Sequence, residues 1–352
     1  MAAGTLVAAL LLALGALLYG PLDKNPVQAR YAGATMILKN DSGREIERIE
    51  VGKGIGRRYR QNQFHKPVGF ADAAGGARNE VFWVAATGPP QTNYVLRAKA
   101  VGADTLLWER PLRFDPSFDR EVLDGSRAFK PEALLAGDLT GEGRPELYVT
   151  AKHMPYFPSL LLRVDPREGT VRQRYAHLGY FATEIHAKEL DRGGRQELLV
   201  GAYSNAFEDP ALVVLDPKNV EGHAPTTEEY RPRGLAPARH HAYLRFPSTK
   251  VQNEAPTTHR TPTSIRLTRA DHIVVEYQDG RLKEAKKAPE VLMHLDERLR
   301  PTAMGTSSTH DRLARQLVSS GRLNGGLGPG DLQRLQREVR YWTGSGWTKE
   351  PR

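Results

Sequence analysis

Short apolar runs, separated by small and polar residues, fill most of this chain. Several pairs of runs flank a tight turn, which is the pattern of β-hairpins. These pairs are residues 35–51, 94–111 and 273–283, which turn at 41–43, 102–104 and 279–280. The 33 glycines and 24 prolines fit a chain full of turns better than a bundle of helices. The pattern therefore predicts an all-β protein.

One loop-and-strand unit occurs three times, at residues 72–83, 138–149 and 189–200. Each copy has an acidic first residue, a glycine-rich bend, Arg at the seventh place, Glu at the ninth and then an apolar run. A weaker echo lies at 271–275. The small residues allow a left-handed bend, and the apolar run that follows is typical of a short buried strand.

Repeated hairpins at a spacing near that of a four-stranded unit are typical of β-propeller blades. We therefore expect a propeller of about five blades, within a range of four to seven, over residues 33–308. Residues 23–32 are expected to form a linker before it. The polar stretch 218–263 is expected to be an insertion between blades.

The unit at 138–149 resembles the FG-GAP/VCBS repeat, a propeller-blade signature that also occurs in integrin α-chain heads. The resemblance covers residues 70–200, and in that family the acidic loops often hold Ca²⁺. It implies Ca²⁺ ligands at Asp138, Thr140, Glu142 and Glu146, with the Arg144 carbonyl between them.

The unit also departs from the family pattern. Thr140 offers a neutral oxygen, and Glu142 and Glu146 are each one methylene longer than the Asp of the family. The second copy has Gly193 at the third ligand position. Calcium needs six to eight oxygens, so an alternative stays open in which the carboxylates accept hydrogen bonds from amides of their own loop.

The polar stretch 218–263 is rich in Pro, Thr, Arg and His. It reads either as a plain surface loop or as a ligand-binding rim. The candidate ligand-binding residues are Arg233, Arg239, His240 and His241. Neighbouring histidines on a strand point to opposite faces, so the pair does not predict a shared metal ion.

The sequence pattern of residues 309–352 differs from that of the preceding strands and predicts a short helical tail. Leu313, Leu317 and Val318 are expected on one side of a first helix, and the sequence from Pro329 to Asp331 predicts the start of a second. We expect these helices to pack against the propeller.

Residues 2–22 carry no charge, and 6–19 are almost entirely Leu, Ala and Val. This predicts an N-terminal hydrophobic helix in residues 1–22, which acts as a signal peptide or a membrane anchor. No Lys or Arg precedes it, so either the N-terminal amine orients the segment or upstream residues are missing. The expectation is a protein anchored in the membrane of the cell envelope, with its bulk periplasmic or extracellular.

The formal charge of +9 comes from basic residues in separate segments, without a nucleic-acid-binding motif. It therefore indicates a solvated basic surface and no nucleic-acid partner. An anionic glycan or a phospholipid surface is the alternative.

The absence of cysteine excludes disulfides, thiolate zinc sites and a cysteine nucleophile. Without a catalytic motif, we expect a non-catalytic propeller that binds a protein or a glycan. The alternatives are a sensory or scaffold ectodomain, or a propeller hydrolase or lyase.

Overall fold

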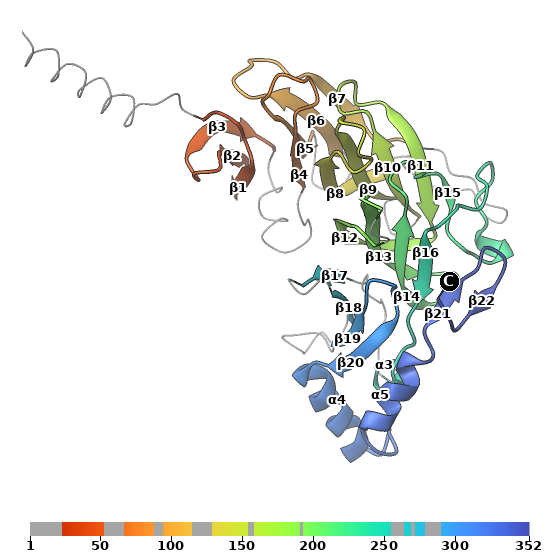
Figure 1. Ribbon diagram of the computed structural model, residues 1–352. Coiled ribbons are helices and arrows are strands. Elements are labelled where there is room, and N and C mark those ends of the chain that lie inside the picture. The colour runs from red at the N-terminus through yellow and green to blue at the C-terminus, as the bar shows by residue number, and fades with distance from the viewer. Residues whose placement is uncertain are drawn as a thin grey trace, which may run out of the picture.

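The computed structural model describes residues 23–52, 67–87, 94–114, 129–153, 158–190, 193–254, 264–268, 272–278 and 290–351. Strands dominate this part of the chain and form five sheets that are almost entirely antiparallel (Figure 1). The expectation of an all-β protein is confirmed. The expected N-terminal helix lies outside the described residues.

The first two sheets are formed by consecutive strands. The first consists of β1 (Gln28–Ala32), β2 (Thr35–Lys39) and β3 (Glu45–Glu50). The second consists of β4 (Val68–Ala71), β5 (Glu80–Ala86), β6 (Tyr94–Ala100) and β7 (Trp108–Pro111). Because β1 is a full member of its sheet, the linker expected at 23–32 is shorter than predicted.

The third sheet is a meander of β8 (Phe129–Gly137), β9 (Glu146–His153), β10 (Ser159–Val164) and β11 (Val171–His177), with β15 (Gly222–His223) added in parallel. The fourth sheet contains β12 (Gly179–Lys188), β13 (Glu197–Ser204), β14 (Asp209–Leu215) and β16 (Ala242–Arg245), and is extended by β21 (Arg340–Trp342) and β22 (Trp347–Thr348). The fifth contains β17 (Ser264–Leu267), β18 (Ile273–Gln278), β19 (Glu290–Leu295) and β20 (Pro301–Thr306).

Four short helices complete the described structure: η1 (Glu228–Tyr230), α3 (Lys250–Glu254), α4 (Ser308–Ser319) and α5 (Pro329–Gln336). Leu313 and Leu317 of α4 are buried against Val251 of α3, as the spacing predicted. Val318 is 36% exposed, because it lies about 100° round the helix from Leu317. The tail is helical only in part, since β21 and β22 return to the fourth sheet.

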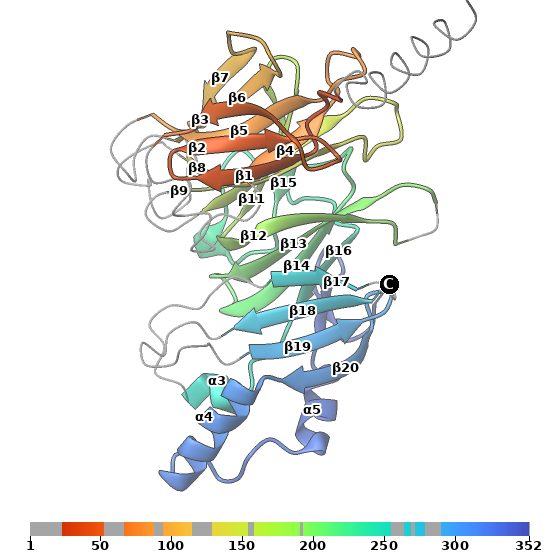
Figure 2. The same ribbon diagram turned by 90° about the vertical axis from the view of Figure 1, so that its left-hand side faces the viewer.

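The sheets pack face to face, and Figure 2 shows them following one another down the molecule. On β9, Leu147 and Val149 belong to the core shared with the first two sheets, whereas Tyr148 faces the fourth. On β13, Val200 faces the third sheet and Leu199 the fifth. Strands buried on both faces explain why the sequence shows continuous apolar runs rather than strict alternation.

The polar stretch 218–263 is not a plain insertion, because it contains β16, the fourth strand of the fourth sheet. The remainder supplies β15, η1 and α3. No helix in the described ranges is long and apolar enough to cross a membrane.

Candidate functional site

The three copies of the repeated unit have the same place in their sheets. Each loop joins the first strand of a sheet to the second, before β5, β9 and β13. The acidic first residue of each accepts a hydrogen bond from a loop amide. Gly75 donates to Asp72 Oδ1 over 2.7 Å, Gly143 to Asp138 Oδ2 over 2.7 Å and Gly194 to Glu189 Oε1 over 2.8 Å. All three glycines have a left-handed backbone, as the motif predicted.

The ninth-position glutamates of the first and third copies also bond to their own loops. Glu80 Oε2 accepts from the amide of Ala73 over 2.7 Å, and Glu197 Oε2 accepts from that of Leu190 over 2.9 Å. Both carboxylates are buried. Each one therefore closes its loop by satisfying the amide next to the acidic first residue.

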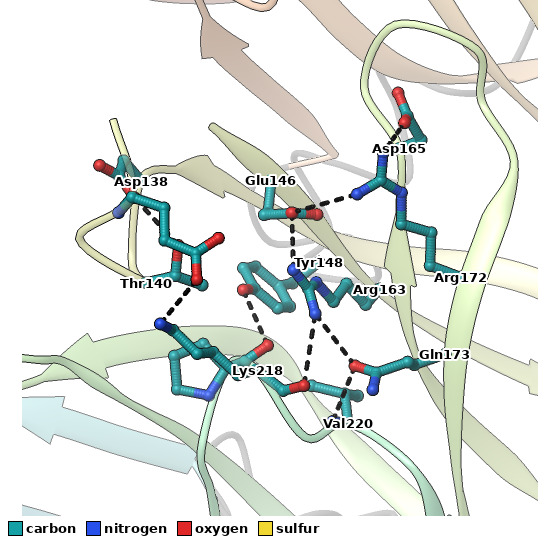
Figure 3. Close-up of polar contacts among 12 residues, drawn as sticks. Asp138, Thr140, Glu146, Tyr148, Arg163, Asp165, Arg172, Gln173, Lys218 and Val220 are labelled. Atoms are coloured by element: carbon teal, nitrogen blue, oxygen red, sulfur yellow. Dashed lines mark hydrogen bonds and ion pairs between the residues drawn. The ribbon is translucent and has the colours of Figure 1, made fainter. Parts of the chain in front are cut away.

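Glu146, the ninth residue of the middle copy, has a different partner. Its Oε1 accepts a hydrogen bond from Arg163 Nη2 over 2.7 Å, and Arg172 Nη1 lies 3.7 Å from the same oxygen (Figure 3). Arg163 is on β10, directly opposite Tyr148 of β9. Residues two apart on a strand share a face, so Glu146 and Arg163 are diagonal neighbours on the face toward the fourth sheet.

The corresponding positions of the other two sheets are apolar. Two residues after Glu80, Phe82 lies opposite Ala98, and two residues after Glu197, Leu199 lies opposite Val214. Neither can donate a hydrogen bond to the glutamate. Of the three positions, only the one opposite Tyr148 carries a side chain that can donate a hydrogen bond to the ninth-position glutamate.

The Arg163 guanidinium also reaches the connection that follows β14. Its Nη1 is 3.3 Å from both Gln173 Oε1 and the Lys218 carbonyl oxygen, and Gln173 Oε1 accepts from the Val220 amide over 3.2 Å. Tyr148 donates its hydroxyl proton to the Pro217 carbonyl over 3.1 Å. Figure 3 shows that this polar network joins the third sheet to the segment after the fourth sheet's third strand.

The predicted calcium ligands have protein partners. Glu142 Oε1 lies 2.7 Å from Lys218 Nζ, whose hydrogen bond lowers the pKa of that carboxyl. Burial would raise the pKa of Asp138, but hydrogen bonds from the amides of Gly143 and Glu142 outweigh it and lower the pKa. Within the described ranges, no three His, Asp or Glu side chains are arranged to hold a metal ion. The predicted ligands, Asp138, Thr140, Glu142 and Glu146, are thus not assembled into one coordination sphere.

A second feature is a groove of about 1280 Å³ beside the fourth sheet. Its walls are the segment before β16, the β19–β20 turn and the C-terminal hairpin. Among its lining residues are Arg239, His240, His241, Glu297, Arg298, Arg300, Trp342 and Glu350. Three of the four predicted ligand-binding residues therefore lie together here, while Arg233 is outside the groove.

Two arginines on the groove are available to a ligand. Arg239 and Arg298 are exposed, and neither makes an ion pair with a residue that the structure describes. Arg300 Nε is 3.9 Å from Asp296 Oδ2, at the limit of an ion pair. Sequence reasoning missed Arg298 and Arg300, because their proximity to Arg239 depends on the packing of the fifth sheet on the fourth.

The turn that carries Arg298 is held in one conformation. Leu299 has a left-handed backbone with φ of 60°, which is unfavourable for a residue with a Cβ. Its side chain is buried, and Tyr341 donates its hydroxyl proton to the Leu299 carbonyl over 2.9 Å. These contacts fix the turn and leave Arg298 on the rim.

His240 and His241 have different roles. His241 is exposed, whereas the His240 ring points inward and its Nε2 is 2.9 Å from the Tyr175 hydroxyl. Nearby, His177 Nε2 is 3.0 Å from the Tyr243 hydroxyl. Burial lowers the pKa of both His177 and His240 to about 3, so both rings are neutral at neutral pH. His240 is therefore part of the packing between the third and fourth sheets.

Comparison of the chain with protein-family models, curated proteins and solved structures finds no match.

Proposed function

We propose that this protein is a non-catalytic, propeller-like binding protein whose groove holds a glycan. The propeller interpretation is supported by the first strands of consecutive sheets, which lie next to one another: β4 contacts β8, β8 contacts β12, and β12 contacts β17. Such strands surround the axis of a propeller, and each is followed by an antiparallel meander, as in a blade.

The observation that carries the glycan proposal is the chemistry of the groove. The guanidinium groups of Arg239 and Arg298 can donate hydrogen bonds to a ligand, and the Glu350 carboxylate can accept them. Glu297 adds a second carboxylate to the lining. A sugar hydroxyl both donates and accepts, so it is suited to such a mixture. Trp342 adds a partly buried indole, packed edge-on against Trp347 with 5.2 Å between ring centroids. An apolar ring that is fixed in place offers a face to the C–H groups of a sugar.

The groove favours a glycan over a simple polyanion because the two carboxylates partly offset its arginines. We place the protein in the cell envelope, with residues 2–22 as the membrane attachment, where extended glycans are available as partners.

Isothermal titration calorimetry with a set of neutral and acidic oligosaccharides tests the proposal. The buffer contains about 0.15 M NaCl, because this salt concentration screens non-specific charge effects. Arg239→Ala and Arg298→Ala are each expected to weaken binding of a retained glycan about tenfold or more, because each removes a charged hydrogen-bond donor. Arg113→Ala, an exposed arginine after β7, is the matched control and is expected to bind as the wild type does.

Equal affinities of all four proteins would contradict the groove as the binding site. Shortening of the bound oligosaccharide during the titration would contradict the non-catalytic assignment. It would favour the hydrolase or lyase alternative.

A further inference from the structure

The resemblance of residues 138–149 to a calcium-binding repeat conflicts with the contacts of those residues. Both Asp138 oxygens accept hydrogen bonds inside the loop, from the amides of Glu142 and Gly143 and from the Thr140 hydroxyl. Glu142 and Glu146 each face a basic side chain. We propose that Arg163 holds this loop in place of a divalent metal ion, with Lys218 neutralising the exposed carboxylate at its tip.

Glu146 is the buried carboxylate of this unit. Its side chain is 7% exposed, and that of Arg163 is 13% exposed. A carboxylate removed from water needs an opposite charge close to it, and Arg163 supplies one over 2.7 Å. The hydrogen bond to Glu146 is also the main reason that the pKa of Arg163 is raised. Arg163 therefore supplies at Glu146 the positive charge that a metal ion would have supplied.

Glu142 and Lys218 form an exposed ion pair at the tip of the loop. Lys218 comes from the connection after β14 and neutralises the carboxylate at the tip of the loop, 2.7 Å away. Its backbone is fixed, because its amide donates to Asp216 Oδ1 over 2.8 Å and its carbonyl accepts from Arg163. The two basic residues thus act on two of the predicted ligands from different segments, Arg163 from β10 and Lys218 from the connection after β14.

The other copies of the unit provide an internal control. In the second and fourth sheets, Ala98 and Val214 occupy the position equivalent to that of Arg163. There, Glu80 and Glu197 accept a hydrogen bond from an amide of their own loop. The deviation of Glu146 is therefore associated with the arginine and not with the motif, which is shared.

The test is the thermal unfolding of the full chain in EDTA and in about 5 mM CaCl₂, a concentration above the dissociation constants of weak protein calcium loops. The wild type is expected to melt at the same temperature in both buffers. Arg163→Met is expected to lower the melting temperature by several degrees in both, and Arg163→Lys is expected to recover most of that loss because it keeps a positive charge.

Arg174→Met is the matched control, because Arg174 is an exposed arginine on β11 without an ion pair among the described residues. It is expected to melt as the wild type does. A calcium-dependent rise in the wild type that Glu146→Gln abolishes would overturn the proposal, since a metal ion would then hold the loop. Wild-type melting of Arg163→Met would overturn it as well.

Discussion

The loops at 138–146 and 72–80 share a motif but use its last glutamate in opposite ways. Glu80 bonds to the amide of Ala73 and closes its own loop, whereas Glu146 bonds to Arg163 on a neighbouring strand. The backbone bends are alike, with left-handed glycines in both. The partner of this glutamate therefore differs with the residue on the neighbouring strand, which is Ala98 in one sheet and Arg163 in the other.

The consequence is a difference between neighbouring sheet junctions. The second and third sheets meet across an apolar core that contains Trp83, Val149 and Leu162. The third and fourth sheets share an apolar core as well, but they are also joined by the polar network around Arg163. The loss of a single polar side chain should therefore lower the free energy of unfolding more at the junction of the third and fourth sheets than at that of the second and third.

Arg163→Met is expected to have the largest effect, because it leaves Glu146 as a buried charge without its closest partner. Breaking a buried ion pair in this way costs about 3–5 kcal/mol in the free energy of unfolding. Urea unfolding measures this loss, since the midpoint and slope of the transition together give the free energy of unfolding. A loss as small as that of the Arg174→Met control, within about 0.5 kcal/mol, would show that the pair contributes little.

The neutral replacement of glutamate by glutamine distinguishes the two loops. Glu146→Gln is expected to cost about 1.5–3 kcal/mol, because the acceptor loses its charge and the Arg163 guanidinium loses its closest anion. Glu80→Gln is expected to cost less than about 1 kcal/mol, since its amide oxygen can still accept from Ala73. Urea unfolding of both variants makes the comparison, and equal losses would mean that the partner's charge does not matter.

Acid should weaken the junction of the third and fourth sheets through His177. The pKa of this buried ring is lowered to about 3, so the unfolded chain binds a proton first as the pH falls. Stability is therefore full above the ordinary histidine pKa of about 6.5 and falls between that pH and 3, by about 2 kcal/mol at pH 5.

Urea unfolding at pH 7 and pH 5 measures this loss. His177→Gln should make the difference between the two pH values smaller, because glutamine does not titrate. An unchanged pH dependence in this variant would exclude His177 as a source of the acid sensitivity.

Lys218→Ala is expected to have the smallest effect. The pair with Glu142 is exposed, with 38% and 54% of the two side chains accessible, so its loss should leave the free energy of unfolding close to that of the wild type. The difference from the wild type should shrink further when about 1 M salt is added, because salt screens exposed charges. A loss comparable to that of Arg163→Met would show that the two cations act as one unit.

The sequence predicted the strands and the bends well, because both depend on local residue types. Val149 and Val200 lie on second strands of successive sheets, where the repeat required them to be. The hydrogen bonds of Asp138 to its own loop were one of the two alternatives that the residues left open. Arg239, His240 and His241 do lie together on one groove.

What the sequence could not provide was register and long-range pairing. Arg163 interrupts an apolar run, which was a signal, but its partner follows only from the pairing of β9 with β10. The membership of β16 in the fourth sheet depends on pairing with β14, and β21 joins that sheet from about one hundred residues further along the chain. The position of Arg298 on the groove likewise depends on long-range packing, that of the fifth sheet against the fourth.

A double-mutant cycle measures directly how strongly Arg163 and Glu146 interact in the folded protein. The cycle combines Arg163→Met, Glu146→Gln and the double variant, each measured by urea unfolding. We expect a coupling free energy of about 2 kcal/mol, with the double variant more stable than the sum of the single losses predicts. Losses that add to within about 0.5 kcal/mol would contradict the account.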